Sequence, residues 1–363
     1  MPAFDVAAVR AQFPALALSD DGKGRVYLDN PAGTQVPQQV IQRMTGTLVG
    51  VNANHGGLFR TSVAADELDA EVHQALADFY NATSADEIAI GQNMTTLTFA
   101  FSRGLARRFH QGDEIVLSRM DHDANVSPWL LMAKDRGLTV RWMDFDPETY
   151  EFAEDALERV LTPQTKLVAL GHASNCTGTI NEVKHFTRQA KAAGALVYVD
   201  AVQFAPHGTL DVQDLGADVV VSSSYKWFGP HMGILWGRRD LLAETFAYKV
   251  RPAGNEPGHK FETGTGSIEG KAGILGAIEY LEQFGLGATR RDRIISAWHH
   301  LADYERGLTQ RLIDGLTPIK GLTVRGITSA NAAHRRGPPL ALPAGGRHPR
   351  SLAPALAPRY ILP

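Results

Sequence analysis

The chain has 363 residues, is 44% hydrophobic and carries a formal net charge of −3 at pH 7. This length allows a large buried core in one or two domains, and the near-neutral charge gives no electrostatic reason to expect nucleic acid or a membrane surface as a partner. No apolar run approaches the roughly 20 residues of a membrane span, and the N-terminus lacks the apolar core of a signal peptide. The single cysteine, Cys176, excludes an internal disulfide and favours a reducing cytoplasm.

The first 80 residues are predicted to be mostly helical. Residues 1–30 predict a short helix followed by a strand, and 35–80 has apolar residues such as Leu68, Val72 and Leu76 at helix spacing. From about residue 85 strands and helices alternate. The predicted strands are 87–90, 114–118, 139–145, 166–174, 195–200, 217–224 and 233–237. Residues 91–109 predict a turn followed by a helix, and further helices are predicted at 125–136, 154–161 and 183–194. Strands separated by helices predict a doubly wound, mostly parallel sheet flanked by helices.

One connection departs from this alternation. No full helix separates strands 195–200 and 217–224, so we expect either a less regular crossover or an antiparallel edge there. The Gly- and Pro-rich stretch 249–267 predicts a long functional loop, and 268–315 is again helical.

These patterns divide the chain into three parts. We expect an N-terminal segment (1–30), a large α/β domain (31–285) and a partial, smaller C-terminal α/β domain (286–363). Residues 326–363 contain five Arg, seven Pro and no acidic residue. Two interpretations stay open for this tail: a loop-rich terminus, or a truncated or frame-shifted chain whose second domain lacks the strands to close a sheet.

The stretch 195–226 contains the strongest chemical signal. Asp200 ends one apolar strand, and Lys226 follows the next. Pyridoxal phosphate (PLP) chemistry needs this pair, because a Lys amine forms a Schiff base with the aldehyde while a carboxylate keeps the pyridine nitrogen protonated. Most lysines are solvated, and an Asp in this position also caps helices, but a Lys after so apolar a strand is desolvated and nucleophilic.

Further candidates surround this pair, each with an ordinary structural alternative. Gln203 is a turn residue or a ligand of the cofactor's phenolic oxygen. Thr95 and Thr96 enter a helix, where free N–H groups and hydroxyls form an anion site, or they are ordinary helix caps. Ser223 is a candidate phosphate donor, as are Ser222 and Ser224, although a serine run after a strand is otherwise only a turn.

Four more residues lie in loops. His122 follows strand 114–118 and offers an aromatic face and a proton carrier for a cofactor ring; otherwise it is a surface histidine. Asn175 ends another strand and could bond the ring oxygen. These strand ends are where ligands bind in open α/β sheets. Thr265, in the Gly-rich loop, could reach a partner subunit's phosphate, and His55 could face substrate.

These motifs together resemble the class V aminotransferase superfamily, and within it the cysteine desulfurases, from about residue 27 to 285. The most specific pieces are GDEIVLSRMDHDANVSPW, TKLVALGHASNCTGTINEVKHF, LVYVDAVQFAPHGTLDVQDLGADVVVSSSYKWFGP and FETGTGSIEGKAGILGAIEYL.

The resemblance implies the PLP-dependent transferase fold of type I, with a seven-stranded sheet, and a homodimer with the site at its interface. It also implies a role for each of several residues. PLP would be held on Lys226, with Asp200 on the pyridine nitrogen, His122 stacked on the ring, Asn175 and Gln203 near the phenolic oxygen, Thr95 and Ser223 on the phosphate, and Thr265 reaching in from the neighbouring subunit.

Three departures from the family pattern matter. Tyr225 stands where the family commonly has a His before the Schiff-base Lys. The persulfide-forming Cys of a mobile C-terminal segment is missing, since Cys176 follows Asn175 on the core sheet. The family's substrate-carboxylate Arg has no counterpart, because Arg325, Arg335 and the tail arginines match no motif.

Two hypotheses follow. The first is a PLP-dependent enzyme in which Lys226 deprotonates the Cα of a small amino acid, giving a lyase, racemase, epimerase or transaminase outcome rather than ordinary persulfide formation. Fold does not decide among these outcomes. The second is a catalytically defective PLP-fold protein that binds cofactor or dimerises without turnover.

Overall fold

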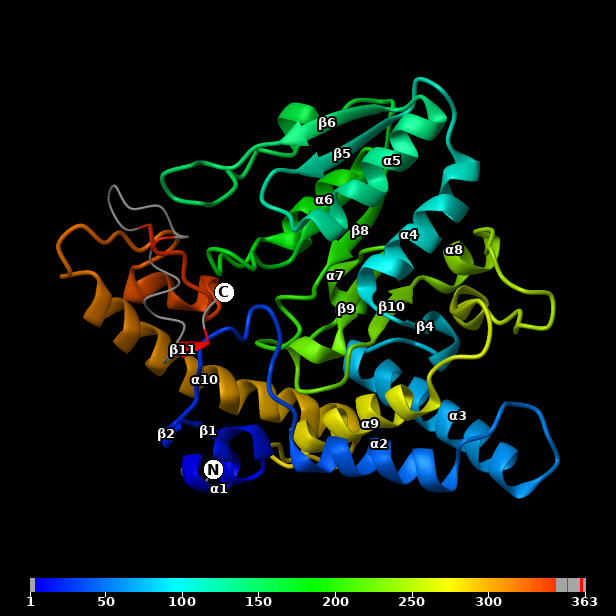
Figure 1. The fold of residues 1–363 in the computed structure, drawn as a ribbon. Helices are drawn as coiled ribbons and strands as arrows, with labels where there is room; N and C mark the ends of the chain where they lie inside the picture. The colour runs from blue at the N-terminus through cyan, green and yellow to red at the C-terminus, as the bar shows by residue number, and fades with distance from the viewer. Residues whose placement is uncertain (1–3, 344–350, 352–359, 362–363) are drawn as a thin grey trace.

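The computed structural model describes residues 4–343, 351 and 360–361, and its centre is one seven-stranded sheet (Figure 1). Its strands, in spatial order, are β4 (Ile88–Gly91), β10 (Gly233–Gly237), β9 (Val219–Ser223), β8 (Leu196–Asp200), β7 (Thr165–Gly171), β5 (Glu114–Ser118) and β6 (Thr139–Met143). The strands from β9 to β6 are all parallel to one another, whereas β10 is antiparallel to both of its neighbours. The predicted mostly parallel α/β sheet is therefore confirmed.

The connection between β8 and β9 is the one that lacks a full helix in the sequence. β8 and β9 are parallel and are joined by a segment whose only helix is the short α7 (Val212–Leu215), which confirms the less regular crossover. The alternative of an antiparallel edge is wrong, because the antiparallel strand β10 lies inside the sheet between β4 and β9.

Helices cover both faces of the sheet. The main helices are α1 (Val6–Ala11), α2 (Gln38–Gly50), α3 (Arg60–Tyr80), α4 (Met94–Leu105), α5 (Ser127–Arg136), α6 (Val183–Ala192), α8 (Arg239–Glu244), α9 (Ile268–Glu282) and α10 (Arg290–Leu316). One core contains side chains of α3, α6, α7 and α9, and the other contains side chains of α4, α5 and α8. In β8, Val197 and Val199 face the first core and Tyr198 faces the second, as the two-residue period of a strand requires.

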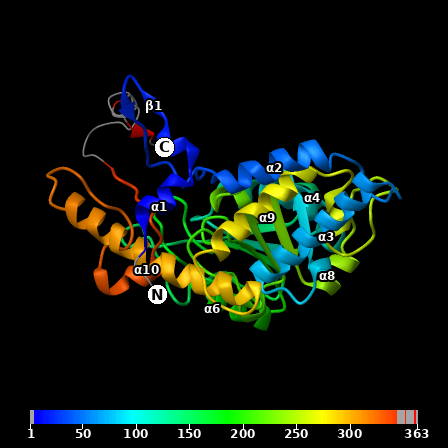
Figure 2. The same ribbon diagram turned by 90° about the horizontal axis from the view of Figure 1, so that it is seen from below.

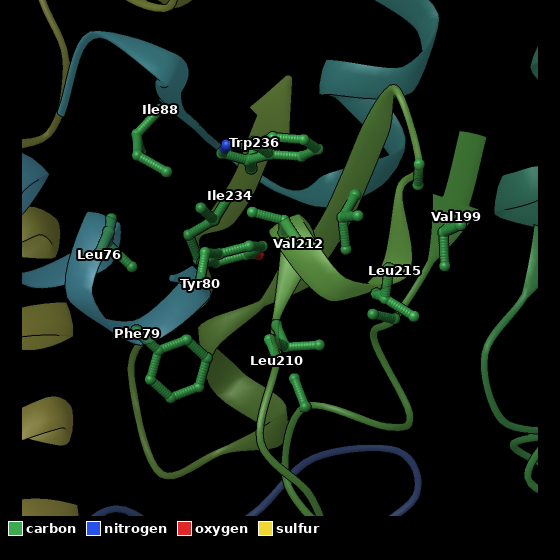
Figure 3. Packing of buried hydrophobic residues seen from close by; sticks show 14 of the residues in the cluster. Leu76, Phe79, Tyr80, Ile88, Val199, Leu210, Val212, Leu215, Ile234 and Trp236 are labelled. Carbon is green, nitrogen blue, oxygen red and sulfur yellow. The ribbon is translucent and has the colours of Figure 1, made fainter. Parts of the chain in front are cut away.

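The first core is densely aromatic where α3 ends. Phe79 and Tyr80 pack there beside Ile234 and Trp236 of β10 (Figure 3). The buried Tyr80 hydroxyl donates a hydrogen bond of 2.6 Å to Ser222 Oγ on β9. This core therefore fixes the end of β9, and with it the turn that carries Lys226.

One predicted helix is wrong. Residues 154–161 form turns and a single 3₁₀ turn, Glu158–Val160, instead of an α-helix. An eight-residue helix is marginal without strong packing, and here only Ala156 and Leu157 are buried.

The C-terminal part follows the long helix α10, which extends beyond the sheet toward the end of the chain (Figure 2). Among the described residues after α10, the regular elements are the 3₁₀ helix η8 (Ala330–Arg335) and the two-residue strand β11 (Tyr360–Ile361). β11 pairs in parallel with β3 (Val26–Tyr27), which joins the tail to the N-terminal segment. The two-residue strands β1 (Ser19–Asp20) and β2 (Lys23–Gly24) form a separate hairpin. No helix within the described residues is long and apolar enough to cross a membrane.

Candidate active site

A cavity of about 430 Å³ lies where the parallel strands of the sheet end. Its lining includes the residues that directly follow β5, β7, β8 and β9, which is where open α/β sheets bind ligands. Seven of the nine predicted site residues line this cavity: Thr95, His122, Asn175, Asp200, Gln203, Ser223 and Lys226. Thr96 and Thr265 do not.

Lys226 lies in the 3₁₀ turn that follows β9, and its side chain is buried. Its Nζ donates a hydrogen bond to the carbonyl oxygen of Pro31 and lies 4.7 Å from the centroid of the Tyr225 ring. Burial lowers the pKa of Lys226, and the carboxylates of Asp29 and Asp200 partly offset that effect. A lysine with a lowered pKa has more of its amine in the nucleophilic form.

Asp200 ends β8 inside the same cavity. Its Oδ1 accepts a hydrogen bond of 2.9 Å from the Val202 backbone N–H. Burial raises the pKa of Asp200 to about 6, against the opposing effects of that hydrogen bond and of the charges on His122 and Lys226. A buried carboxylate with a raised pKa would be stabilised in its ionised form by a ligand that brings a cationic N–H donor into the cavity.

The serine run separates into three different environments. Ser222 accepts the Tyr80 hydrogen bond in the core, and Ser224 Oγ donates a hydrogen bond of 2.6 Å to the Pro230 carbonyl. Ser223 points to the other face of β9 from Ser222 and is the member of the run that lines the cavity. The geometry therefore favours Ser223 among the three candidate donors.

Thr95 and Thr96 also lie in different environments. Asn93 caps α4, and its Oδ1 accepts hydrogen bonds from the Thr96 amide (2.8 Å) and the Thr96 hydroxyl (2.9 Å). Thr96 is exposed and has the ordinary capping role, whereas Thr95 lines the cavity. Gly233 allows β10 to pack closely against the start of α4, because a Cβ at this position would lie only 2.2 Å from the Asn93 carbonyl carbon.

The first turn of α4 borders the cavity at Thr95. Backbone N–H groups in the first turn of a helix have no partner within the helix, so they can donate to an anion there.

Three polar side chains complete the lining. His122 is exposed, and its Nδ1 accepts the Ala124 N–H at 3.1 Å, which leaves Nε2 to carry the proton of a neutral ring. Asn175 is also exposed. Gln203 is buried, and its Oε1 has no hydrogen-bond partner among the described residues. Buried amide oxygens are almost always bonded, so this oxygen is available to accept from a donor in the cavity.

Two predicted residues lie elsewhere on the surface. Thr265 is exposed, and its hydroxyl lies 3.4 Å from Asn54 Oδ1. His55 is exposed as well, with Nδ1 2.9 Å from Asp66 Oδ1. Neither residue lines the cavity of its own chain.

The sequence analysis missed two walls of the cavity. One is the N-terminal strap, defined here as residues 29–34, of which Asp29, Pro31 and Ala32 line the cavity. The other is the tail segment Pro339–Ala341. The strap had a signal, since a predicted strand ends at its Asp-Asn pair; the tail wall had none, because its residues form no periodic element.

The cavity also contains Asp121, which the sequence analysis passed over although it directly precedes His122. The residue is partly buried, and its Oδ2, which is inaccessible to solvent, lacks a partner within the described part of the chain. Burial raises the pKa of Asp121 to about 7, and the charge of Asp200 acts in the same direction. Two carboxyl groups therefore share this site.

The tail is held against the site by Arg336, a residue that is only 5% exposed. It donates hydrogen bonds to the carbonyl oxygens of Thr177, Ile327, Gly337 and Pro339. Arg335 forms an ion pair with Glu151, and the Arg325 guanidinium lies 5.8 Å from the centroid of the Tyr150 ring. Among the remaining tail arginines, Arg347, Arg350 and Arg359 lie outside the described residues.

Comparison with known proteins agrees with this geometry. The family model for aminotransferase class V matches residues 26–361. The cysteine desulfurase of Serratia proteamaculans is 34% identical over 339 residues, covering 89% of this chain and 80% of its own length. A probable cysteine desulfurase of Streptomyces coelicolor is 32% identical, covering 97% of this chain and 85% of its own length.

Solved structures show the same fold. The cysteine desulfurase of Thermococcus onnurineus matches 98% of this chain and 86% of its own with a TM-score of 0.87 at 26% identity. The Escherichia coli cysteine desulfurase CsdA gives a TM-score of 0.81, also at 26% identity, with the same coverage. A C-DES mutant with glycine covalently linked to its PLP cofactor gives 0.82 at 23% identity, covering 97% of this chain and 90% of its own. The type I fold expected from the sequence is thereby confirmed.

These matches correct one expectation about the tail. The resemblance seen in the sequence ended near residue 285, whereas the family model continues to residue 361.

Proposed function

Because this chain belongs to the aminotransferase class V family, whose members depend on PLP, we propose that it is a PLP-dependent enzyme that acts on a small amino acid. One observation carries the proposal: a buried lysine and a buried carboxylate, Lys226 and Asp200, line a single cavity of about 430 Å³. Cavities of this size hold small molecules.

The residues present fit PLP. Asp200 offers a carboxylate to a pyridine N–H, and Gln203 Oε1 is a buried acceptor that lacks a donor among the described residues. Ser223, Thr95 and the first turn of α4 offer hydroxyl and amide donors to a phosphate. His122 supplies an imidazole at the open side of the cavity.

When bound, PLP supplies an aldehyde that reacts with amines and a ring that draws electrons from the substrate's Cα. Lys226 would provide the amine that holds the cofactor, and its Nζ would take the proton from the substrate's Cα. Asp200 keeps positive charge at the ring nitrogen, and His122 Nε2 carries a second exchangeable proton. These residues can serve elimination, racemisation, epimerisation or transamination, and the fold does not select among them.

A second candidate activity is sulfur transfer from L-cysteine, and the position of Cys176 favours it. The chain has no other cysteine, and Cys176 is exposed and lines the cavity beside Asn175. In this reaction the Cys176 thiolate attacks the substrate sulfur, the substrate's C–S bond breaks, the carbon takes up a proton and alanine leaves while Cys176 keeps the sulfur as a persulfide. We rank sulfur transfer second because Cys176 lies on the loop after β7, whereas the persulfide-forming cysteine of the family lies on a mobile C-terminal segment that can reach the substrate.

A homodimer is part of the proposal. Large apolar side chains are exposed around the end of α2, the loop 51–59 and the Gly-rich loop: Leu48, Val49, Leu58, Phe59, Tyr248 and Val250. The Asn54–Thr265 contact and the Val250–Thr263 backbone hydrogen bond join these segments into one surface. A contiguous apolar surface of this kind is typical of a protein interface. Pairing two copies there would bring Thr265 to the boundary between subunits.

We also propose that the protein acts in the reducing cytoplasm, because its single cysteine cannot form an internal disulfide.

The proposed function is tested by the visible spectrum of the protein with PLP, recorded while small amino acids including L-cysteine are added. We expect a band that shifts with at least one amino acid, and mass spectrometry of the product then names the outcome. Alanine formation that requires Cys176 would establish sulfur transfer, with Cys176→Ser against the wild type as the matched pair. A band that never shifts would support the catalytically defective alternative, and no band would refute cofactor binding.

A further inference from the structure

The N-terminal strap is bonded to the turn that carries Lys226. The Thr34 N–H and the Thr34 hydroxyl both donate to the Tyr225 carbonyl, at 2.9 and 3.1 Å, and the Phe228 N–H donates to Thr34 Oγ1 at 2.8 Å. Lys226 Nζ itself donates to the Pro31 carbonyl. The strap and the lysine turn thus form one hydrogen-bonded unit, although about 190 residues of sequence separate them.

Asp29 begins this strap. Its backbone carbonyl accepts hydrogen bonds from the Ala32 and Gly33 amides, so the strap turns back on itself directly after Asp29. Asp29 lines the cavity, and its side-chain Oδ1 is buried with no hydrogen-bond partner in the described ranges. A buried carboxylate oxygen needs a donor or a positive charge.

Asp29 and Lys226 line the same cavity, and the Pro31 carbonyl that accepts from Lys226 Nζ lies two residues from Asp29 on the strap. Of the carboxylates that act on the Lys226 ammonium, Asp29 has the larger effect and Asp200 the smaller. The other titratable side chains that line the cavity with this pair are Asp121, His122, Cys176 and Tyr225. Asp200 acts on the lysine from the end of β8, where its Oδ1 also accepts the Val202 N–H, whereas Asp29 acts on it from the strap side.

We propose that Asp29 is a positioning residue for Lys226: the Pro31 carbonyl holds the free ammonium of Lys226 at the strap by a hydrogen bond, and the negative charge of Asp29, on the same strap, stabilises that ammonium across the cavity and thereby sets when the amine is available. The inference rests on the proposed function, since Lys226 matters because of its reaction with the cofactor. Asp29 is not placed in contact with the cofactor. It acts through Lys226.

The proposal is tested on the protein without PLP, by the pH dependence of Lys226 labelling. Trace acetylation with acetic anhydride, followed by mass spectrometry of the Lys226 peptide, gives the pH at which the amine becomes reactive. Removing the negative charge in Asp29→Asn removes stabilisation of the ammonium, so the midpoint is expected to fall by about one pH unit. Asp29→Glu, which keeps the charge, is expected to restore it. The exposed Lys134 serves as an internal reference.

The controls separate this role from a general effect. Asp123→Asn removes an equal charge from an exposed residue next to His122 and is expected to leave the midpoint unchanged. Asp29→Ser is a second neutral variant in case Asp29→Asn does not fold; failure of both to fold would overturn a positioning role. An unchanged midpoint in the neutral variants, or an equal shift in Asp123→Asn, would also overturn it. If the midpoint falls but the wild type never shows a PLP band, the proposed function fails and the Asp29–Lys226 pairing stands.

Discussion

The cavity has a floor and two walls, and they differ in how the chain builds them. The floor consists of residues at the ends of β8 and β9, Asp200, Ser223 and Lys226, which are fixed by strands buried on both faces. The walls are the strap 29–34 and the tail segment 339–341, which have no helix or strand of their own and are held by hydrogen bonds to distant loops. In the proposed function the floor supplies the reactive groups, whereas the walls position them and shape the cavity. Substitutions in the two regions should therefore fail in different ways.

The largest expected effect is in the floor. Lys226→Ala removes the amine proposed to hold PLP and to take the Cα proton, and should reduce turnover by roughly 10³-fold or more with the fold intact. Steady-state rates with the amino acid found active, together with a thermal melt, check this. A variant that keeps more than about a tenth of the activity would show that Lys226 is not the reactive amine.

The pH dependence of the free energy of unfolding tests the environment of Asp121, which lies beside the floor of the cavity. Because the pKa of Asp121 is raised to about 7 from 3.8, the folded state holds a proton that the unfolded state releases. Its favourable contribution is thus full below about pH 4 and is lost as the pH rises through 7. Asp121→Asn should raise the free energy of unfolding of the PLP-free protein at pH 8 by on the order of 3 kcal/mol, and by much less at pH 4. Urea melts at the two pH values measure this, with the exposed Asp135→Asn as control; equal effects at both would contradict it.

Substitutions in the tail wall should lower stability and expose the tail segment to proteolysis. Arg336→Met leaves buried carbonyls without their donor, so we expect a loss of about 2 kcal/mol in the free energy of unfolding. Proteolytic cleavage near residue 336 should also increase. Arg335→Ala, which removes a half-exposed ion pair with Glu151, should cost less than about 1 kcal/mol. Similar losses in both variants would mean that Arg336 does not hold the wall.

The smallest expected effect separates two neighbouring threonines. Thr95→Ala removes a hydroxyl that lines the cavity and should weaken PLP binding by about tenfold. Thr96→Ala removes a hydroxyl already bonded to Asn93 and should leave PLP affinity nearly unchanged. Titration of the PLP band gives both affinities, and the reverse order would place the phosphate away from Thr95.

The same division explains what could be predicted from the sequence. Apolar runs of strand length that end at Asp200 and just before Lys226 predicted both the sheet and this pair of site residues, because short, continuously apolar runs that alternate with helices are typical of buried parallel strands. The serine run stayed ambiguous until Tyr80 and Pro230 were seen to occupy Ser222 and Ser224. The roles of Asp29 and Pro339–Ala341 depend on contacts between segments far apart in the chain, which no local pattern contains. Helix 154–161 failed because packing, rather than propensity, decided its conformation.

The central claim is that Lys226 holds PLP in this cavity, and reductive trapping tests it most directly. The protein is incubated with PLP and reduced with sodium borohydride, which fixes the cofactor to the amine that holds it, and the digest is analysed by mass spectrometry. The account predicts the cofactor's mass on the Lys226 peptide, with no such peptide from Lys226→Ala. Labelling spread over exposed lysines such as Lys134, or none at Lys226, would contradict it.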